Sequence, residues 1–239
     1  AAASTRLGFG AKRTMRAAQG LYEGVRLKGE GQVGLITYMR TDSTHISNDA
    51  ISNTRKYIAN KFGDAYLPEE ANYYTSSNKS AQEAHEAIRP TDVSRHPDTL
   101  PATLDEDQRR LYELIWSRFV ACQMTAAKWH RTEIFFTRDD QKNEATFKVS
   151  GRTIAFDGFY KASGIPSPDS EQNLPKLEKG INLFPFNIHP KQQFSSAPSR
   201  YSEASLIKKL ESEGIGRPST YASIIDVIQF RKYVEKIKI

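Results

Sequence analysis

The chain carries the segment Gly34-Leu35-Ile36-Thr37-Tyr38-Met39-Arg40-Thr41-Asp42-Ser43, in which a phenol and a guanidinium stand two residues apart. An extended backbone alternates its side chains between two faces, so Tyr38 and Arg40 are expected to point the same way. A phenol, with a pKa near ~10, is a poor nucleophile at neutral pH, but an adjacent bidentate cation stabilises both the phenolate and a phosphate transition state. Taken alone, such a pair is more often a half-buried tyrosine beside a solvated arginine.

Two further blocks strengthen the chemical interpretation. They are Ala84-His85-Glu86-Ala87-Ile88-Arg89-Pro90-Thr91 and Gly214-Ile215-Gly216-Arg217-Pro218-Ser219-Thr220-Tyr221-Ala222. Together with Gly34 to Thr44, and in this order, they resemble the type IA DNA topoisomerases. Met39 stands where topoisomerase III relatives usually carry proline, so the bacterial topoisomerase I branch fits better. The resemblance extends from about Ala1 to Val234 and is strongest in the three blocks.

The composition is typical of a soluble globular protein of one to three domains, with 239 residues, 38% hydrophobic and 26% charged. The apolar runs are much shorter than the roughly 18 residues of a membrane-spanning helix, so no membrane partner is expected. The single cysteine, Cys122, excludes an internal disulfide and a thiolate zinc cluster. It indicates a reducing compartment, and the resemblance implies a cytoplasmic, nucleoid-associated protein.

The basic charge is concentrated in the first quarter of the chain. The net charge is +6, and residues 1–61 alone hold ten Lys or Arg against four Asp or Glu. A basic region around Tyr38 suits a polyphosphate ligand and predicts salt-sensitive binding. An ordinary solvated surface would show the same excess, so charge alone leaves both interpretations open.

Periodicity predicts helices in the first half of the chain. Ala11 to Glu23 forms a basic amphipathic helix, and Ser47 and Gly63 bound a second one. The capping box from Thr103 to Glu106 begins a third helix, and its acidic residues are expected to cap that helix and not to bind metal. Val33 to Met39 is apolar enough for a short buried strand or a helix end.

The second half changes period. Thr132 to Thr137, Ala145 to Val149 and Arg152 to Phe156 predict an antiparallel sheet, with a further strand pair from Ile181 to Phe194. Near the C-terminus, a helix capped by Ser202 breaks at Gly214, and Pro218 is expected in the first turn of the next helix.

These patterns and the resemblance together imply a mixed α and β, multidomain fold. A mostly helical domain over residues 10–120 carries the tyrosine, residues 1–9 and 121–199 form an antiparallel β-rich gate or hinge domain, and residues 200–239 begin a helical DNA-groove domain. The chain opens without an initiator Met and stops inside an alternating segment, so we expect a fragment of a longer protein.

The resemblance assigns catalytic roles to three residues. Tyr38 matches the nucleophile that attacks a phosphodiester of single-stranded DNA and keeps the 5′-phosphate on its phenol, so the strand is resealed without ATP. Arg40 would position the cleaved phosphate, and His85 would contact a phosphate nearby. The implied activity is strand passage that relaxes negatively supercoiled duplex DNA.

Further residues are implied in DNA binding. Arg89 and Thr91 are expected to contact phosphates or to act as structural caps. Arg217, Ser219 and Thr220 would contact phosphates at a helix N-terminus, and Tyr221 would either stack on a base or pack.

The resemblance also implies Mg²⁺ in the full-length enzyme, bound by the carboxylates of an N-terminal domain that this chain lacks, and no metal ligand is assigned here. That missing domain is therefore an expected partner, and the isolated chain should bind DNA weakly and cleave it poorly or not at all.

Three alternatives remain. The chain could be a non-catalytic DNA-binding module with a structural Tyr38, part of a reverse gyrase, or, less well matched, a tyrosine recombinase.

Two other motifs do not fit their context. Gly29 to Gly34 spells a dinucleotide fingerprint but does not open a helix, and His85-Glu86 lacks the second histidine of a zinc protease.

Overall fold

The computed structural model describes residues 1–74, 86–102, 104–137, 146–165, 172–184, 187 and 189–237. The fold mixes helices and strands and divides into two compact units. The helical unit comprises Ala1–Thr125, Phe159–Gly164 and Tyr201–Ile239, and the hairpin unit comprises Ala126–Gly158 and Ile165–Arg200. Residues 1–9 and 201–239 therefore lie in the same unit as Tyr38, while the division into three domains stays a prediction.

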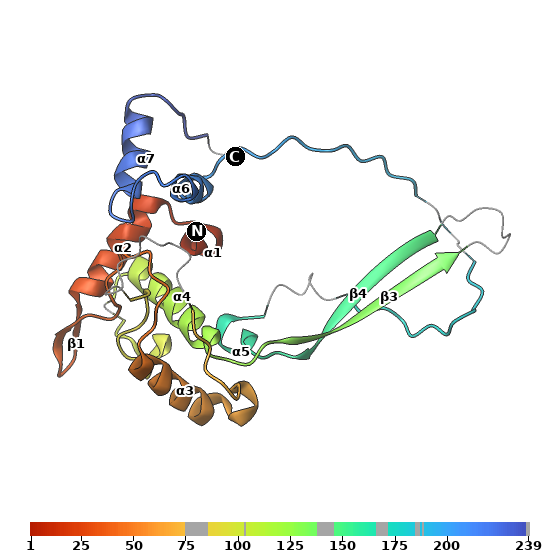
Figure 1. Cartoon of the computed structure of the whole chain (residues 1–239), viewed down its shortest axis with the longest axis horizontal. Coiled ribbons are helices and arrows are strands. Elements are labelled where there is room, and N and C mark those ends of the chain that lie inside the picture. The colour runs from red at the N-terminus through yellow and green to blue at the C-terminus, as the bar shows by residue number, and fades with distance from the viewer. Residues whose placement is uncertain are drawn as a thin grey trace. The chain divides into compact units, whose positions relative to one another are not determined.

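Figure 1 shows the elements in chain order. They are α1 (Ala2–Leu7), α2 (Ala11–Glu23), β1 (Val25–Leu27), β2 (Gly31–Val33), α3 (Asn48–Phe62), η1 (Asp64–Tyr66), η2 (Pro97–Thr99), α4 (Glu106–Cys122), β3 (Lys128–Thr137), β4 (Thr146–Phe156), α5 (Tyr160–Ser163), α6 (Glu203–Ser212) and α7 (Tyr221–Phe230). None of the helices in the described ranges is both long and apolar enough to cross a lipid bilayer.

Helix α4 starts at an acidic cap. The carboxylate of Asp105 accepts the backbone N–H groups of Asp107 and Gln108 at 2.9 and 3.3 Å, so the helix begins at Glu106. The expected start at Thr103 was therefore too early, and Thr103 itself lies outside the described residues. The prediction that the acidic run caps a helix is confirmed.

Helix α4 also supplies the centre of the helical core. It packs against α1, α2 and η2, and its buried side chains include Tyr112, Trp116 and Val120. The polar atoms of the buried rings are satisfied, because the Tyr112 hydroxyl donates to the Arg95 carbonyl at 2.8 Å and the Trp116 indole donates to the Val93 carbonyl at 2.9 Å. The core can therefore bury large aromatic rings without leaving donors unpaired.

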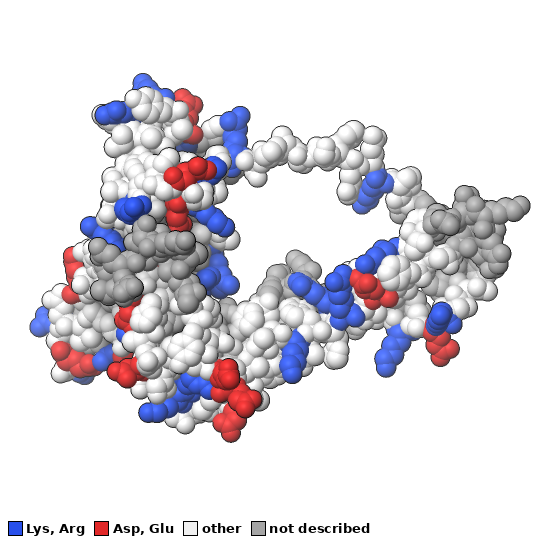
Figure 2. Space-filling view, in the orientation of Figure 1, with Lys and Arg blue, Asp and Glu red and all other residues white. Residues whose placement is uncertain are grey.

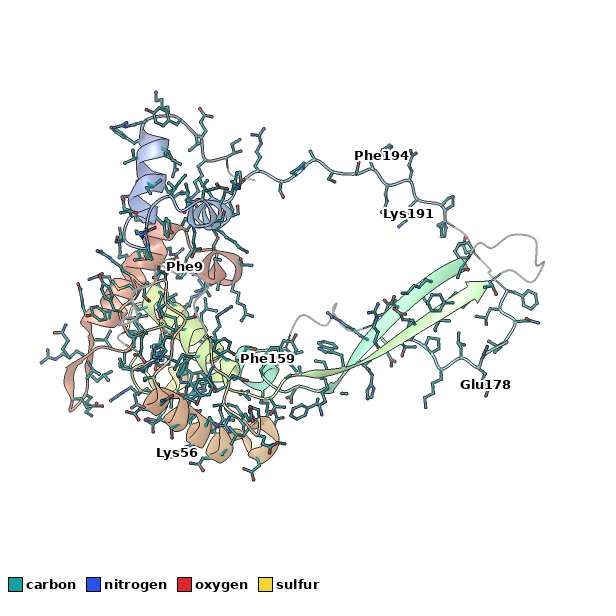
Figure 3. All side chains as sticks on the ribbon, viewed as in Figure 1. Phe9, Lys56, Phe159, Glu178, Lys191 and Phe194 are labelled. Carbon is teal, nitrogen blue, oxygen red and sulfur yellow. The ribbon has the colours of Figure 1, made fainter. Side chains whose placement is uncertain are left out.

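Helix α2 has the predicted bounds and lies against α4. Ala18 and Leu21 face the core, which confirms the amphipathic pattern. Phe9, at the junction of α1 and α2, is only 1% exposed, and the Arg13 guanidinium lies 4.2 Å from its ring centroid (Figure 3). This contact fixes the start of α2 to the core.

Helix α3 also follows its prediction. The Ser47 hydroxyl accepts the Ala50 N–H at its start, Ile51 and Ile58 are buried, and the helix ends at Gly63, where φ is 93°. The spacing of apolar residues and the two end signals were sufficient to place it.

The C-terminal helices α6 and α7 bury little of their surface. Ser202 and Ser205 form the expected cap of α6, but α6 has no fully buried residue, and α7 has one, Ile225. Helix α7 begins at Tyr221 and not near Pro218, because a turn intervenes. The contact of these helices with α2 is therefore thin.

The hairpin unit contains one long antiparallel pair, β3 and β4, in place of the three strands predicted. The stretches 146–149 and 152–156 belong to the single strand β4, which continues through Gly151 opposite Thr132. A Cβ at Gly151 would lie 2.7 Å from Leu174 Cγ, so glycine here permits a close crossing and does not make a turn.

The strand pair expected between Ile181 and Phe194 is wrong for the described residues of that range, which contain no strand. Their side chains are exposed, with Phe184 at 88% and Phe194 at 81%; Figure 3 marks Lys191 and Phe194 on this extended segment. An alternating pattern specifies a strand only where another strand supplies hydrogen bonds, and the described part of residues 181–194 is not paired in this way.

Candidate active site

Tyr38 projects from a segment that is anchored on both sides. Leu35, Ile36 and Met39 are buried, whereas Tyr38 is 44% exposed and Arg40 is exposed. The segment is not the predicted strand, because β2 ends at Val33 and only Ile36 forms a bridge, to Pro90. The phenol and the guanidinium nevertheless both reach the surface, one on each side of buried Met39.

A set of hydrogen bonds ties the Tyr38 segment to the second sequence block. The Thr37 N–H donates to the Arg89 carbonyl and the Arg89 N–H donates to the Thr37 hydroxyl, both at 2.9 Å. The Thr37 hydroxyl in turn donates to the Ala87 carbonyl at 2.8 Å. The Thr91 N–H and hydroxyl donate to the carbonyls of Leu35 and Gly34 at 3.0 and 2.7 Å. Residues some 50 positions apart thus hold the backbone before Tyr38.

Replacing Thr37 with Val is expected to lower the free energy of unfolding by roughly 1–3 kcal/mol, because it leaves the part-buried Arg89 N–H and Ala87 carbonyl without this partner. Urea denaturation of the chain measures the loss. Thr37→Ser is the matched control, since it retains the hydroxyl. A loss in Thr37→Ser with none in Thr37→Val would show that the methyl group, and not the hydrogen bonds, stabilises the segment.

Tyr22 is a neighbour of the nucleophile candidate that the sequence analysis missed. Its ring meets that of Tyr38 edge to face, with centroids 5.2 Å apart. Tyr22 lies in the last turn of α2, separated from Tyr38 by the β1–β2 hairpin. Nothing in its local sequence signals this contact, which limits the positions open to the phenol.

The Arg89 side chain is held within its own block. Its Nη2 and Nε donate to the Glu86 carboxylate at 2.8 and 3.3 Å, and its Nη1 donates to the Pro90 carbonyl at 3.0 Å. Glu86 also accepts the Ser47 N–H at 2.9 Å. Burial raises the pKa of Glu86, but the hydrogen bonds from Arg89 and Ser47 outweigh it and leave that pKa below its ordinary value.

Arg89 and Thr91 of the second block thus both make structural contacts. A phosphate contact by either residue stays a prediction. Glu86, which orders the block, was not singled out from the sequence. His85 lies outside the described residues.

The third block forms the turn before α7. The Thr220 hydroxyl accepts the Arg217 N–H at 2.8 Å and donates to the Arg217 carbonyl at 3.1 Å. Arg217 and Ser219 are exposed, and Tyr221 is half-buried. Burial raises the pKa of the Tyr221 phenol. The predicted phosphate contacts of Arg217, Ser219 and Thr220 remain open, with the Thr220 hydroxyl already used in the turn.

A cavity of about 280 Å³, here called the Tyr221 pocket, brings the first and third blocks together. The first block contributes Met39, Thr41 and Asp42, and the third contributes Pro218 and Tyr221. Most of the remaining lining residues belong to α1, α2 and α6. The structure thus places Tyr221 beside the residues that follow Tyr38, a relation that sequence separation concealed.

Two of the three cations of α2, Lys12 and Arg13, are paired with acids. Lys12 lies 3.5 Å from Asp226 of α7, and the Arg13 Nε donates to Asp107 of α4 at 2.7 Å. Figure 2 shows Lys and Arg interspersed with Asp and Glu on the visible face of this unit. A second cavity, of about 550 Å³, lies among these side chains and is also lined by Arg16. These two ion pairs partly neutralise the positive charge of α2.

Glu203 of α6 caps α2 from 192 residues away. Its Oε2 accepts the Ala11 N–H at 2.8 Å and its Oε1 accepts the Lys236 ammonium at 2.6 Å. These hydrogen bonds hold the pKa of Glu203 below its ordinary value. Gly10, the residue before α2, has no side chain that could cap the helix. Glu203 supplies the cap instead and so attaches α6 to α2.

Replacing Glu203 with Gln is expected to destabilise the chain by roughly 1 kcal/mol at neutral pH. A carboxyl whose pKa is lowered by folding contributes stability above its unfolded-state pKa and loses that contribution as the pH falls through its folded-state pKa. The difference between wild type and variant in urea denaturation should therefore shrink from pH 7 to pH 3. A difference that stays constant over this range would contradict the ionic role.

No three Asp, Glu, His or Cys side chains converge on a possible metal site anywhere in the described ranges. Asp105 caps α4, and Asp107 pairs with Arg13. The described residues therefore do not form a Mg²⁺ site, and whether another part of the full-length protein binds Mg²⁺ stays a prediction.

Comparison with known proteins bears on the identity of the chain. A family model described as DNA topoisomerase matches residues 1–238. DNA topoisomerase 1 of Campylobacter jejuni is 51% identical over 232 residues, covering 97% of this chain and 32% of the relative. DNA topoisomerase 1 of Pseudomonas aeruginosa is 50% identical over 234 residues, covering 98% of this chain and 25% of the relative.

A solved structure of the same family also matches this chain. Full-length topoisomerase I from Thermotoga maritima matches with a TM-score of 0.75 and 38% identity over 99% of this chain and 37% of that chain. The chain thus spans between a quarter and somewhat more than a third of the length of these relatives. The resemblance first drawn from three short sequence blocks is confirmed by matches along nearly the whole chain, which belongs to the DNA topoisomerase family.

Proposed function

We propose that this chain is part of a type IA DNA topoisomerase and that Tyr38 is its nucleophile. The phenolate oxygen of Tyr38 forms a bond to a phosphorus of single-stranded DNA, and the bond from that phosphorus to the 3′-oxygen breaks. The phenol loses its proton and the departing 3′-oxygen gains one. The reverse reaction reseals the strand, so no ATP is needed, and passage of another strand between the two steps relaxes negative supercoils.

The observation that supports this proposal best is the exposure of Tyr38 on a fixed backbone. Its neighbours Leu35, Ile36 and Met39 are buried, yet its own ring is 44% exposed. A tyrosine with a purely structural role would gain by burying that ring, since a buried aromatic ring stabilises the fold by about 1.5–3 kcal/mol. Exposure of the reactive oxygen on a well-anchored segment is what attack on a DNA strand requires.

Arg40 is proposed to hold the phosphate that Tyr38 attacks. It is exposed on the other side of buried Met39. A guanidinium donates two parallel hydrogen bonds to a phosphate, and so it would stabilise the charge that develops as the phosphorus–oxygen bond forms.

We also propose that Mg²⁺ is bound by a part of the full-length protein outside this chain, and that the chain alone therefore cleaves DNA poorly or not at all. The proposed substrates are single-stranded DNA and negatively supercoiled duplex DNA.

A labelled oligonucleotide tests the proposal. Full-length protein is incubated with single-stranded DNA and Mg²⁺, quenched with denaturant and analysed on a denaturing gel. A 5′-phosphotyrosine link retains the downstream fragment, so a 3′-label should stay with the protein and a 5′-label should be released. Peptide mapping should locate the link at Tyr38. A link of opposite polarity, or one at another residue, would exclude this mechanism.

The same assay with the 239-residue chain tests the need for a partner domain. We expect no adduct, and efficient adduct formation would contradict that part of the proposal. Among the alternatives, a DNA-binding module predicts no adduct from the full-length protein either. The relatives named above are DNA topoisomerase 1 proteins, which gives the reverse gyrase and recombinase alternatives no support.

A further inference from the structure

The segment that carries Tyr38 is attached to the C-terminal end of α2, although the β1–β2 hairpin separates the two in the chain. The Leu35 N–H donates to the Leu21 carbonyl at 2.8 Å and so satisfies a carbonyl of the last helical turn. Gly34 permits this approach, because a Cβ there would lie 2.7 Å from the Tyr22 carbonyl oxygen. The chain therefore returns to α2 three residues before Tyr38.

These contacts fix the backbone of Tyr38 but leave its ring free to rotate. Leu35, Ile36 and Met39 are buried and hold the main chain on both sides, whereas the Tyr38 side chain is 44% exposed. Such a side chain has up to three staggered χ1 rotamers. Attack on a phosphorus requires the phenol oxygen to point at it, so the rate depends on the population of the productive rotamer.

The ring of Tyr22 supplies a contact that selects among these rotamers. Its centroid lies 5.2 Å from that of Tyr38, and the two ring planes meet at 66°, which is the favourable edge-to-face arrangement. Tyr22 is itself well placed to act as a fixed partner, because it lies in the last turn of α2 directly after fully buried Leu21. A ring that approaches from another element opposes rotation of Tyr38 about its Cα–Cβ bond.

The contact leaves both rings accessible. Tyr22 is 41% exposed and Tyr38 is 44% exposed, so the pair buries little surface and stabilises the fold only weakly. Within the described ranges no hydrogen bond joins the two side chains, and the contact is made by the rings. The orientation of the Tyr38 phenol thus depends on the aromatic ring of Tyr22 and not on its hydroxyl.

From this geometry we infer that Tyr22 is a positioning residue of strand cleavage, whose ring holds the Tyr38 phenol in the rotamer that attacks the phosphorus. This inference rests on the proposed function. It adds to that function a residue that acts through Tyr38 without touching the reacting atoms. The energy of one aromatic pair corresponds to a change of roughly threefold to tenfold in the cleavage rate.

The test is single-turnover cleavage of a labelled oligonucleotide by the full-length protein at saturating DNA. Tyr22→Leu removes the aromatic ring and keeps an apolar side chain. It should lower the rate roughly threefold to tenfold, because Tyr38 then populates rotamers that cannot attack. The affinity for the oligonucleotide should not change. An unchanged rate, or weaker binding with an unchanged rate at saturation, would overturn the inference.

Tyr22→Phe separates the ring contact from chemistry of the hydroxyl. This variant keeps the ring, so it should cleave at the wild-type rate and with the wild-type pH dependence. A rate loss as large as that of Tyr22→Leu, or an altered pH profile, would show that the hydroxyl acts and would overturn the inference. Tyr73→Leu makes the same substitution at another exposed tyrosine and should leave the rate unchanged. An equal loss in Tyr73→Leu would also overturn it.

The rates are compared at a temperature at which circular dichroism shows every variant to be folded. A second measurement places 3-fluorotyrosine at position 38 of the full-length protein. Its ¹⁹F resonance should have the same shift in wild type and Tyr22→Phe and a different shift in Tyr22→Leu, and one common shift in all three would contradict the ring contact. Failure of the wild-type protein to form any adduct would instead count against the proposed function, so the two failures are distinguishable.

Discussion

Replacing Tyr38 with Phe in the full-length protein is expected to abolish both covalent adduct formation and supercoil relaxation. The substitution removes one oxygen atom and leaves the ring, so the contact with Tyr22 and the packing around Met39 should persist. Loss of a covalent nucleophile lowers turnover by on the order of 10⁴-fold or more. Relaxation of negatively supercoiled plasmid, followed on agarose gels over enzyme concentration, measures the effect.

Tyr73→Phe is the matched control for Tyr38→Phe, because Tyr73 is another exposed tyrosine of the helical unit, at 71% exposure. It should relax plasmid at the wild-type rate. Both variants should unfold at the same urea concentration as wild type, since neither loses a buried group. Retained relaxation in Tyr38→Phe would eliminate the nucleophile assignment and favour the DNA-binding module.

Replacing Arg40 with Ala is expected to lower the rate of strand cleavage by roughly 10²–10³-fold, the usual effect of removing one group that stabilises charge in a transition state. Because Arg40 is exposed, stability should change little. Arg40→Lys should recover only part of the rate, since an ammonium supplies the charge but not the two parallel hydrogen bonds. Single-turnover cleavage of a labelled oligonucleotide separates this chemical step from DNA binding.

The control for Arg40 is Arg6→Ala, which removes an exposed arginine of α1. It tests whether any lost cation lowers cleavage through weaker DNA attraction. A general electrostatic effect would appear in both variants and would disappear when DNA is saturating. If Arg40→Ala binds DNA more weakly but cleaves it at the wild-type rate when DNA is saturating, Arg40 binds the strand but does not assist the chemistry.

The helices could be predicted with good accuracy because their signals are local. The bounds of α2 follow from apolar spacing, and α3 follows from Ser47 and Gly63 at its ends. The strand predictions succeeded less well. The pattern predicts one strand ending at Val149 and another beginning at Arg152, whereas both stretches lie within β4, and none of the described residues around Phe194 lies in a strand. Strand formation depends on a second segment, which local sequence does not specify.

The segment around Tyr38 shows the same division. Its residue types predict roles for Tyr38 and Arg40, but the alternation proposed for them assumed a strand that does not form. Their exposure comes instead from the burial of Met39 between them and from the hydrogen bonds between Thr37 and the backbone of Arg89. A side chain's exposure thus depended on contacts some 50 residues away.

By itself, the sequence determined the family, the helices with clear end signals, and the residue types able to attack and hold a phosphate. Those properties reside in short contiguous blocks, where side-chain chemistry and backbone preference act locally. The tertiary structure decided which groups meet: Glu203 at the start of α2, Tyr22 against Tyr38, and Tyr221 beside Met39. The physical reason is that hydrogen bonds and packing act over a few ångströms of space, whatever the number of residues between the partners.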